Sequence, residues 1–149
     1  MTKEISQKRH PAITTASILC FIIGMGWSIG SPSSIVYMIR NRSLPLRTIL
    51  FPVIDGQIRV MGQIRGLSGP FEALGMDAMI LLALLFYIIN LLYIPAGYWL
   101  WKSRRKGGIL EISLLALSGV FWWGFGLPPF PVIGLLIAGL LGAGWKSLR

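Results

Sequence analysis

The sequence is poor in the residues on which most enzyme chemistry depends. It has one cysteine, one histidine and five acidic residues in a chain of 149. A single thiol forms no internal disulfide and no redox pair, and Cys20 lies inside an apolar run. His10 alone cannot build a bis-histidine haem site or a histidine-based metal cluster. We therefore expect no metal and no cofactor.

Charged residues are scarce as well, at 13% against about 25% in an ordinary soluble domain. Apolar residues make up 54% and gather in long runs, which excludes a disordered chain and argues against a soluble enzyme. No Ser–His or Cys–His nucleophile system is available, because the only histidine is in the polar N-terminal tail. The glycines of residues 56–66 lack the Lys-Ser/Thr of a phosphate-binding loop. We predict a protein that is not an enzyme.

What the sequence does contain is four apolar segments, and a membrane-spanning helix needs about 20 such residues. The segments cover residues 12–30, 76–101, 109–127 and 130–146. A long loop, residues 31–75, follows the first segment, and a short basic loop, residues 102–108, follows the second. The predicted fold class is an all-α integral membrane protein, a bundle of four transmembrane helices that forms one domain over residues 1–149.

The first segment leaves two questions open. Ser-Pro-Ser-Ser at residues 31–34 predicts a break or kink, followed by a short helix that ends at Arg40. The segment is also compatible with a cleaved signal peptide, because a basic start precedes the apolar run and small residues close it. The run is longer than the usual apolar core of about 7–15 residues, which favours a retained transmembrane helix.

The long loop is rich in glycine and proline, and it contains the tetrapeptide GQIR at residues 56–59 and again at 62–65. Asp55 and Arg59 are four residues apart, and apolar residues share a face with that spacing, which favours an amphipathic helix in the membrane interface. A short hairpin that turns at Gly62 is the alternative. We expect a partly ordered extracytoplasmic loop.

Charge distribution predicts the topology. Four spans place both termini and the 102–108 loop on one side of the membrane. That side holds nine of the basic residues: Lys3, Lys8, Arg9, Lys102, Arg104, Arg105, Lys106, Lys146 and Arg149. The other side holds five, all arginine: Arg40, Arg42, Arg47, Arg59 and Arg65. Positive residues favour the cytoplasmic side, so both termini are expected there, and a prokaryotic plasma membrane is the expected location.

The net charge of +9 points to lipid rather than nucleic acid, because the basic residues flank apolar segments. Lys102, Arg104, Arg105 and Lys106 are expected to contact anionic headgroups. The five arginines of the other side suit an acidic partner or lipid phosphates, because guanidinium binds carboxylate and phosphate in a forked geometry. The alternative for them is a solvated loop.

Three polar side chains lie within or at the ends of the spans. Asn90 is in the middle of the second span, with Pro95 after it, and predicts an interhelical hydrogen bond beside a kink. Glu111 is expected in the first turn of the third helix, and Asp77 in that of the second, where a helix N-terminus favours a carboxylate. Glu111 also raises the hypothesis of a proton-coupled site. Small multidrug transporters are similar in size and helix number, but they carry a glutamate in their first helix, where this chain has no acidic residue.

Small residues four apart predict the faces on which helices meet. They are Gly134, Ala138 and Gly142 in the last span and Gly26 and Gly30 in the first. The expected function is that of an accessory or structural subunit of a larger membrane complex. The alternative is a homo-oligomeric small transporter or channel, in which Asn90, Pro95 and Glu111 line a path between protomers.

Overall fold

The computed structural model describes residues 10–43, 70–125 and 129–149, and all regular elements within these ranges are helical. Four are α-helices: α1 (Pro11–Arg40), α3 (Met76–Trp101), α4 (Arg105–Gly124) and α5 (Pro129–Gly144). Two are short 3-10 helices: η1 (Pro70–Leu74) and η2 (Trp145–Ser147). The prediction of an all-helical chain is confirmed for the described part.

Three of these helices are long and apolar enough to cross a membrane: α1 with 30 residues, α3 with 26 and α4 with 20. At 1.5 Å per residue they are about 45, 39 and 30 Å long, and the hydrocarbon core of a bilayer is about 30 Å thick. The last helix is apolar but shorter, since α5 has 16 residues. The chain thus has the composition and helix lengths of a membrane-associated protein.

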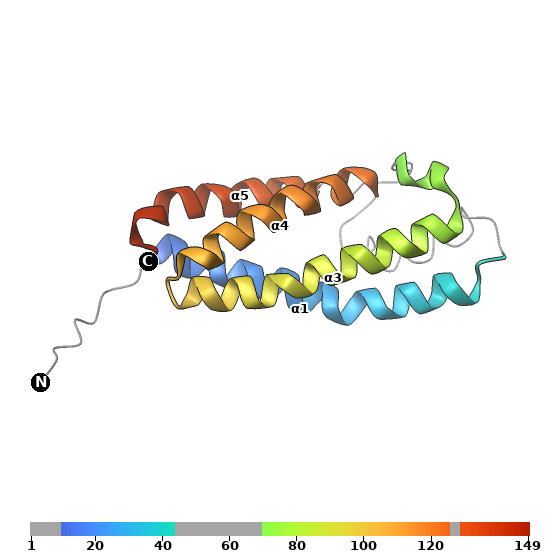
Figure 1. Ribbon diagram of the computed structural model, residues 1–149, viewed down its shortest axis with the longest axis horizontal. Coiled ribbons are helices and arrows are strands. Elements are labelled where there is room, and N and C mark those ends of the chain that lie inside the picture. Colours follow the sequence, from blue (N-terminus) through green and yellow to red (C-terminus); the bar gives the residue numbers. More distant parts are fainter. Residues whose placement is uncertain (1–9, 44–69, 126–128) are drawn as a thin grey trace, which may run out of the picture.

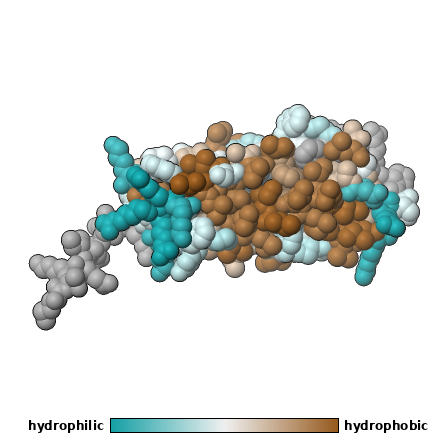
Figure 2. Space-filling model, viewed as in Figure 1, coloured by the Kyte–Doolittle hydropathy of each residue, from teal (hydrophilic) through white to brown (hydrophobic). Residues whose placement is uncertain are grey.

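The helices run up and down side by side (Figure 1). α1 packs along α3, α4 folds back against α3, and α5 lies against both α4 and α1. The start of α1, the α3–α4 loop and residues 145–149 meet at one end of the bundle, which we call the basic end. Figure 2 shows hydrophilic residues gathered at the two ends and a hydrophobic belt between them.

α1 does not end at Gly30 but continues through Pro32 to Arg40. A proline inside a helix costs about 3 kcal/mol, because it removes one backbone hydrogen bond and crowds the preceding turn. Beyond the proline, Ile35 and Met38 are buried in a cluster with residues of α3, so the continued helix packs against a neighbouring helix. Ser33 also donates a hydrogen bond of 2.8 Å to the carbonyl oxygen of Gly30.

The α3–α4 loop is shorter than predicted, because α4 begins at Arg105 rather than at Ile109. Gly107 allows the chain to turn back against the end of α3 within this short loop. A Cβ atom there would lie 2.6 Å from the backbone nitrogen of Leu100, so no larger residue fits against the end of α3. One consequence is that Glu111 is the seventh residue of α4 and not part of its first turn.

α1 and α3 approach each other most closely around two glycines. A Cβ atom on Gly24 would lie 2.9 Å from Cγ1 of Ile94, and one on Gly97 would lie 3.2 Å from Cβ of Cys20. The Ser17 hydroxyl donates a hydrogen bond of 2.7 Å to the carbonyl oxygen of Gly97 across this contact. Close backbone approach and interhelical hydrogen bonds are what hold helices together in lipid.

Candidate functional site

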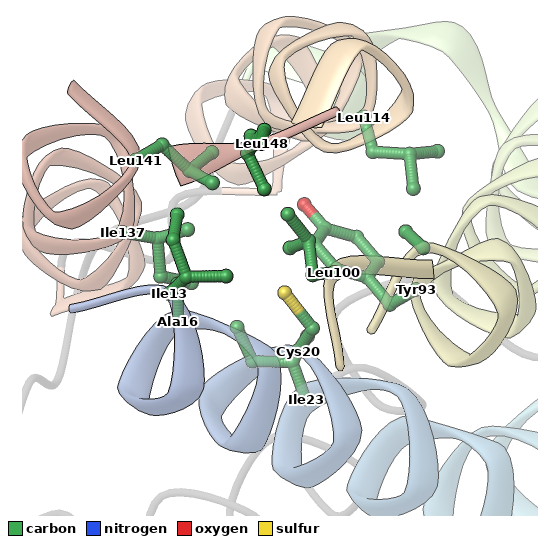
Figure 3. Packing of buried hydrophobic residues seen from close by; sticks show 11 residues of the cluster. Ile13, Ala16, Cys20, Ile23, Tyr93, Leu100, Leu114, Ile137, Leu141 and Leu148 are labelled. Carbon is green, nitrogen blue, oxygen red and sulfur yellow. The ribbon is translucent and has the colours of Figure 1, made fainter. Parts of the chain in front are cut away.

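The interior of the bundle contains a small set of polar side chains. Among the described residues, the buried polar or charged ones are Ser17, Ser31, Asn90, Glu111 and Ser118. The Cys20 thiol and the Tyr93 hydroxyl lie in the same interior, and Figure 3 shows both in the main apolar cluster. We treat the group around Glu111 as the candidate site, because it holds an ionisable side chain with no exposed surface.

Glu111 is placed in the interior by the periodicity of α4. Residues 107, 108, 111, 114, 118, 121 and 122 are buried, a spacing of three to four that marks one helix face. Glu111 is 0% exposed, and neither of its carboxyl oxygens has a hydrogen-bond partner among the described residues. The predicted position in the first turn, stabilised by the helix N-terminus, is therefore wrong.

Cys20 from α1 and Tyr93 from α3 are the polar neighbours of this carboxyl. The Cys20 thiol lies beside the Glu111 carboxyl and interacts with it, although neither carboxyl oxygen meets a donor in hydrogen-bond geometry. The Tyr93 hydroxyl is already engaged, because it forms a hydrogen bond of 2.9 Å with the Ser118 hydroxyl of α4. Glu111 is thus enclosed without a cation or a strong donor beside it.

The interhelical hydrogen bonds of the interior are not the predicted ones. Asn90 is 1% exposed, but its amide nitrogen donates to the carbonyl oxygen of Phe86, four residues back in the same helix, at 2.7 Å. The pair that joins α3 to α4 is Tyr93 and Ser118, a contact that was not predicted from the sequence. The sequence does contain an indication that Ser118 lies in the interior, because it is seven residues after Glu111 and so shares its helix face.

The interior is closed at the basic end by the segment of residues 145–149, which we call the C-terminal segment. Trp145 and Leu148 cover Gly108 of α4, where a Cβ atom would lie 2.8 Å from Cζ3 of the tryptophan and 2.9 Å from Cδ1 of the leucine. Figure 3 shows Leu148 between Leu141 and Leu114, above Tyr93.

Backbone hydrogen bonds hold the C-terminal segment to the α3–α4 loop. The Arg105 N–H donates to the carbonyl oxygen of Arg149 at 2.6 Å, and the Arg149 N–H donates to that of Ser103 at 2.9 Å. Both bonds lie at the basic end, where water competes for such groups.

The predicted lipid-contacting cations surround this end. Lys102, Arg104, Arg105 and Lys106 are all exposed. Two of them lie over aromatic rings of α3: the Lys106 amine is 4.5 Å from the ring centre of Trp99, and the Lys102 amine is 5.8 Å from that of Tyr98. Cation–π contacts of this kind fix the position of a charge next to an aromatic ring.

The predicted arginine group lies partly outside the described residues. Arg40 and Arg42 are exposed at the end of the bundle opposite the basic end, whereas Arg47, Arg59 and Arg65 fall in the range 44–69, which the structure does not describe. Two structures were predicted for residues 41–75, an interfacial helix or a hairpin, and most of these residues fall in that same range. Asp77 is exposed in the first turn of α3, the position that the sequence predicts.

The predicted packing positions divide into two classes. Gly134 is covered by Trp122, whose Cζ3 would lie 2.8 Å from a Cβ atom there. Ala138 and Gly142 face away from the bundle and are exposed. Gly26 is also exposed, with open space where its Cβ atom would be, and Gly30 is half-buried. The glycines that α1 and α3 use against each other are Gly24 and Gly97, which the prediction missed.

The chemistry available within the described residues is limited. No group of three histidine, cysteine or acidic side chains that could hold a metal ion occurs in residues 10–43, 70–125 and 129–149. The site offers one carboxyl, one thiol and a tyrosine–serine pair. Comparison with protein families, characterised proteins and solved structures finds no match to this chain.

Proposed function

We propose that this chain is a non-catalytic integral membrane protein with four spans and both termini on the cytoplasmic side. Three helices of sufficient length and apolarity support the membrane assignment. The excess of cations around the basic end supports the orientation, since positive loops favour the cytoplasm. Trp99, Trp101 and Trp145 belong to the same end, where tryptophan favours the interface between lipid and water.

Within that class, we propose the role of an accessory subunit that binds another membrane helix through α5. The observation that carries this proposal is the outer face of α5, where small residues remain uncovered by the chain's own helices: Ala138, Gly139, Gly142 and Ala143. The sites of Gly139 and Gly142 have nothing within 4 Å of a Cβ atom. Small residues on such a face let a second helix approach closely.

The length of α5 adds a second reason. Its 16 residues span about 24 Å, which is less than the hydrocarbon core of about 30 Å. When a span is shorter than the membrane, the mismatch in length is relieved by thinning of the bilayer, by flanking side chains or by association with other helices. Association also covers the small-residue face, so one partner helix satisfies both requirements.

The test is purification of the tagged chain in mild detergent, followed by mass spectrometry of its partners and of the intact complex. We expect stoichiometric foreign subunits, and we expect Gly142→Leu to release them. Gly26→Leu is the matched control, because Gly26 is also exposed with open space around it. A chain that purifies alone, or equal loss of partners in both variants, contradicts the proposal.

A second candidate, a small transporter, is favoured by one specific observation, the buried Glu111. Ionisable residues within membrane spans are costly and commonly mark ion or substrate paths. In the structure, however, Glu111 and Asn90 are enclosed by the helices of one chain. We therefore propose, for this candidate, a path that lies inside a single bundle rather than between protomers. Flux into vesicles that is abolished by Glu111→Gln distinguishes this candidate from the accessory subunit.

A further inference from the structure

We propose that Glu111 is a proton-binding site that opens to water at the basic end of the bundle, with the C-terminal segment, residues 145–149, as its cover. This inference depends on neither the accessory nor the transporter role, because it concerns a ligand that the isolated chain binds. It rests on the enclosure of the carboxyl and on the way in which the cover is attached.

The enclosure identifies the ligand. A carboxylate enclosed in apolar surroundings without a strong donor or a cation is strongly disfavoured, so Glu111 needs a positively charged ligand. Cys20, Tyr93 and Leu114, from three different helices, are at most 1% exposed and pack around the site. A proton is the ligand that this packing admits without rearrangement, because it adds no volume beyond the O–H bond.

The groups that face Glu111 do not compete with it for that proton. From α1, the titratable group that faces it is the Cys20 thiol, and from α3 it is the Tyr93 hydroxyl. The Tyr93 hydroxyl is already hydrogen-bonded to Ser118, and the Cys20 thiol, like any thiol, is a weak hydrogen-bond donor. α5 and the C-terminal segment present Ile137, Leu141 and Leu148, none of which titrates.

The route to water follows the face of α4 toward the basic end. Gly107 and Gly108 precede Glu111 by four and three residues, so they lie on its helix face between the carboxyl and the exposed cations. Backbone and Cβ atoms of α3 cover Gly107, and these atoms belong to a rigid helix end. Side chains of Trp145 and Leu148 cover Gly108, and these two side chains can move away from it.

The attachment of the C-terminal segment makes it the movable part. Its described backbone bonds to the loop are those of Arg149 with Arg105 and Ser103, both at the basic end. When this segment lifts, water reaches Glu111, the O–H bond of the carboxyl breaks, and the proton passes to that water. The exposed cations of the α3–α4 loop and of the first turn of α4 then stabilise the carboxylate. Opening is therefore favoured as pH rises, and closure as pH falls.

The first experiment maps carbodiimide modification of the full chain in detergent by mass spectrometry. Dicyclohexylcarbodiimide, which is apolar, reacts with protonated carboxyls in apolar surroundings. We expect modification at Glu111 that declines as pH rises, and none at this position in Glu111→Gln. Modification at Glu111 that does not decline as pH rises overturns the assignment of a proton site.

The second experiment tests the cover with a water-soluble carbodiimide at one fixed pH. Leu148→Ala is expected to raise the rate at Glu111 about tenfold or more, because truncation of a buried leucine destabilises its packed state. Ile137→Ala is the matched control, since Ile137 is buried in the same cluster but does not cover Gly108. Equal rates in the two variants overturn the role of the C-terminal segment, even where the proton site stands.

The alkylation rate of Cys20 checks both variants for general loosening. Cys20 is the sole cysteine of the chain, it is buried, and it lies beside Glu111. We expect faster alkylation in Leu148→Ala than in Ile137→Ala. The reverse order means that the core opens elsewhere and contradicts a cover at the basic end.

Discussion

Leu148 lies on Gly108, with its Cδ1 atom 2.9 Å from where a Cβ atom of residue 108 would be. This contact joins the C-terminal segment to the helix face that carries Glu111 three residues further on. It closes the polar interior of the bundle at the end where the cations gather.

Gly108→Ala is expected to displace the C-terminal segment. The added methyl group meets the ends of two side chains, which can move, so we expect a loss of about 1–3 kcal/mol rather than unfolding. Unfolding in detergent measures the loss, and the rate of Cys20 alkylation is expected to rise. Gly119→Ala is the control, because a Cβ atom there has nothing within 4 Å. Equal effects of the two substitutions would argue against a specific contact at Gly108.

Gly24→Leu is expected to separate α1 from α3. A side chain at this position collides with Ile94 and with the backbone of α3, so the cost is about 1–3 kcal/mol or more. Gly26→Leu, two residues on, faces open space and is expected to leave the unfolding temperature nearly unchanged. Thermal unfolding in detergent compares the two. A larger effect at Gly26 would mean that α1 is rotated relative to the arrangement described.

Tyr93 and Ser118 are expected to be energetically coupled. Tyr93→Phe removes the hydrogen bond between α3 and α4 while keeping the ring, and Ser118→Ala removes its other partner. Interhelical hydrogen bonds in membrane proteins contribute about 0.6 kcal/mol on average. A double-mutant cycle of unfolding free energies is expected to give a coupling of this size. Additive effects of the two substitutions show that the bond is absent in the folded protein.

Replacement of Glu111 by leucine is expected to stabilise the bundle or leave it unchanged. A buried polar group without partners costs about 1–3 kcal/mol, and leucine removes that cost. Thermal unfolding in detergent compares Glu111→Leu with the wild-type chain, and marked destabilisation by leucine would reveal a partner for the carboxylate.

The exposed cations of the α3–α4 loop and of the first turn of α4 are expected to retain anionic lipid. Replacing Lys102, Arg104, Arg105 and Lys106 by glutamine removes charges worth about 1 kcal/mol each near an anionic surface. Lipid that copurifies with the protein, measured by mass spectrometry, is expected to contain less phosphatidylglycerol relative to phosphatidylcholine when both are supplied. The double variant Arg40→Gln and Arg42→Gln, at the opposite end, serves as the control. An unchanged lipid ratio in the loop variant contradicts this prediction.

The sequence predicts the helices better than it predicts their mutual orientation. The range Met76–Trp101 coincides with the predicted second span, because an unbroken apolar run between a glycine and a basic cluster defines both ends. Pro32 misled the prediction for α1. Local chemistry disfavours a helix there, but the segment beyond Pro32 stays helical and packs Ile35 and Met38 against the distant α3.

The interior contacts could not be predicted from the sequence for a related reason. Gly24 and Gly26 look alike in the sequence, and only the rotation of α1 about its axis decides which one meets α3. The partners Tyr93 and Ser118 are 25 residues apart, and their meeting depends on how α3 and α4 are aligned lengthwise. The position of Glu111 beyond the first turn follows from the early start of α4, where two glycines lie against neighbouring segments.

All the proposed roles depend on four spans that bring the start of α1 and the C-terminal segment to one side of the membrane. The most direct test is single-cysteine labelling with an impermeant maleimide in right-side-out and inverted vesicles, in a Cys20→Ala background. We predict that His10→Cys and Arg149→Cys are labelled only in inverted vesicles, and that Asn41→Cys is labelled only in right-side-out ones. Labelling of His10→Cys and Arg149→Cys from opposite sides would contradict the four-span bundle, and with it the closed site around Glu111.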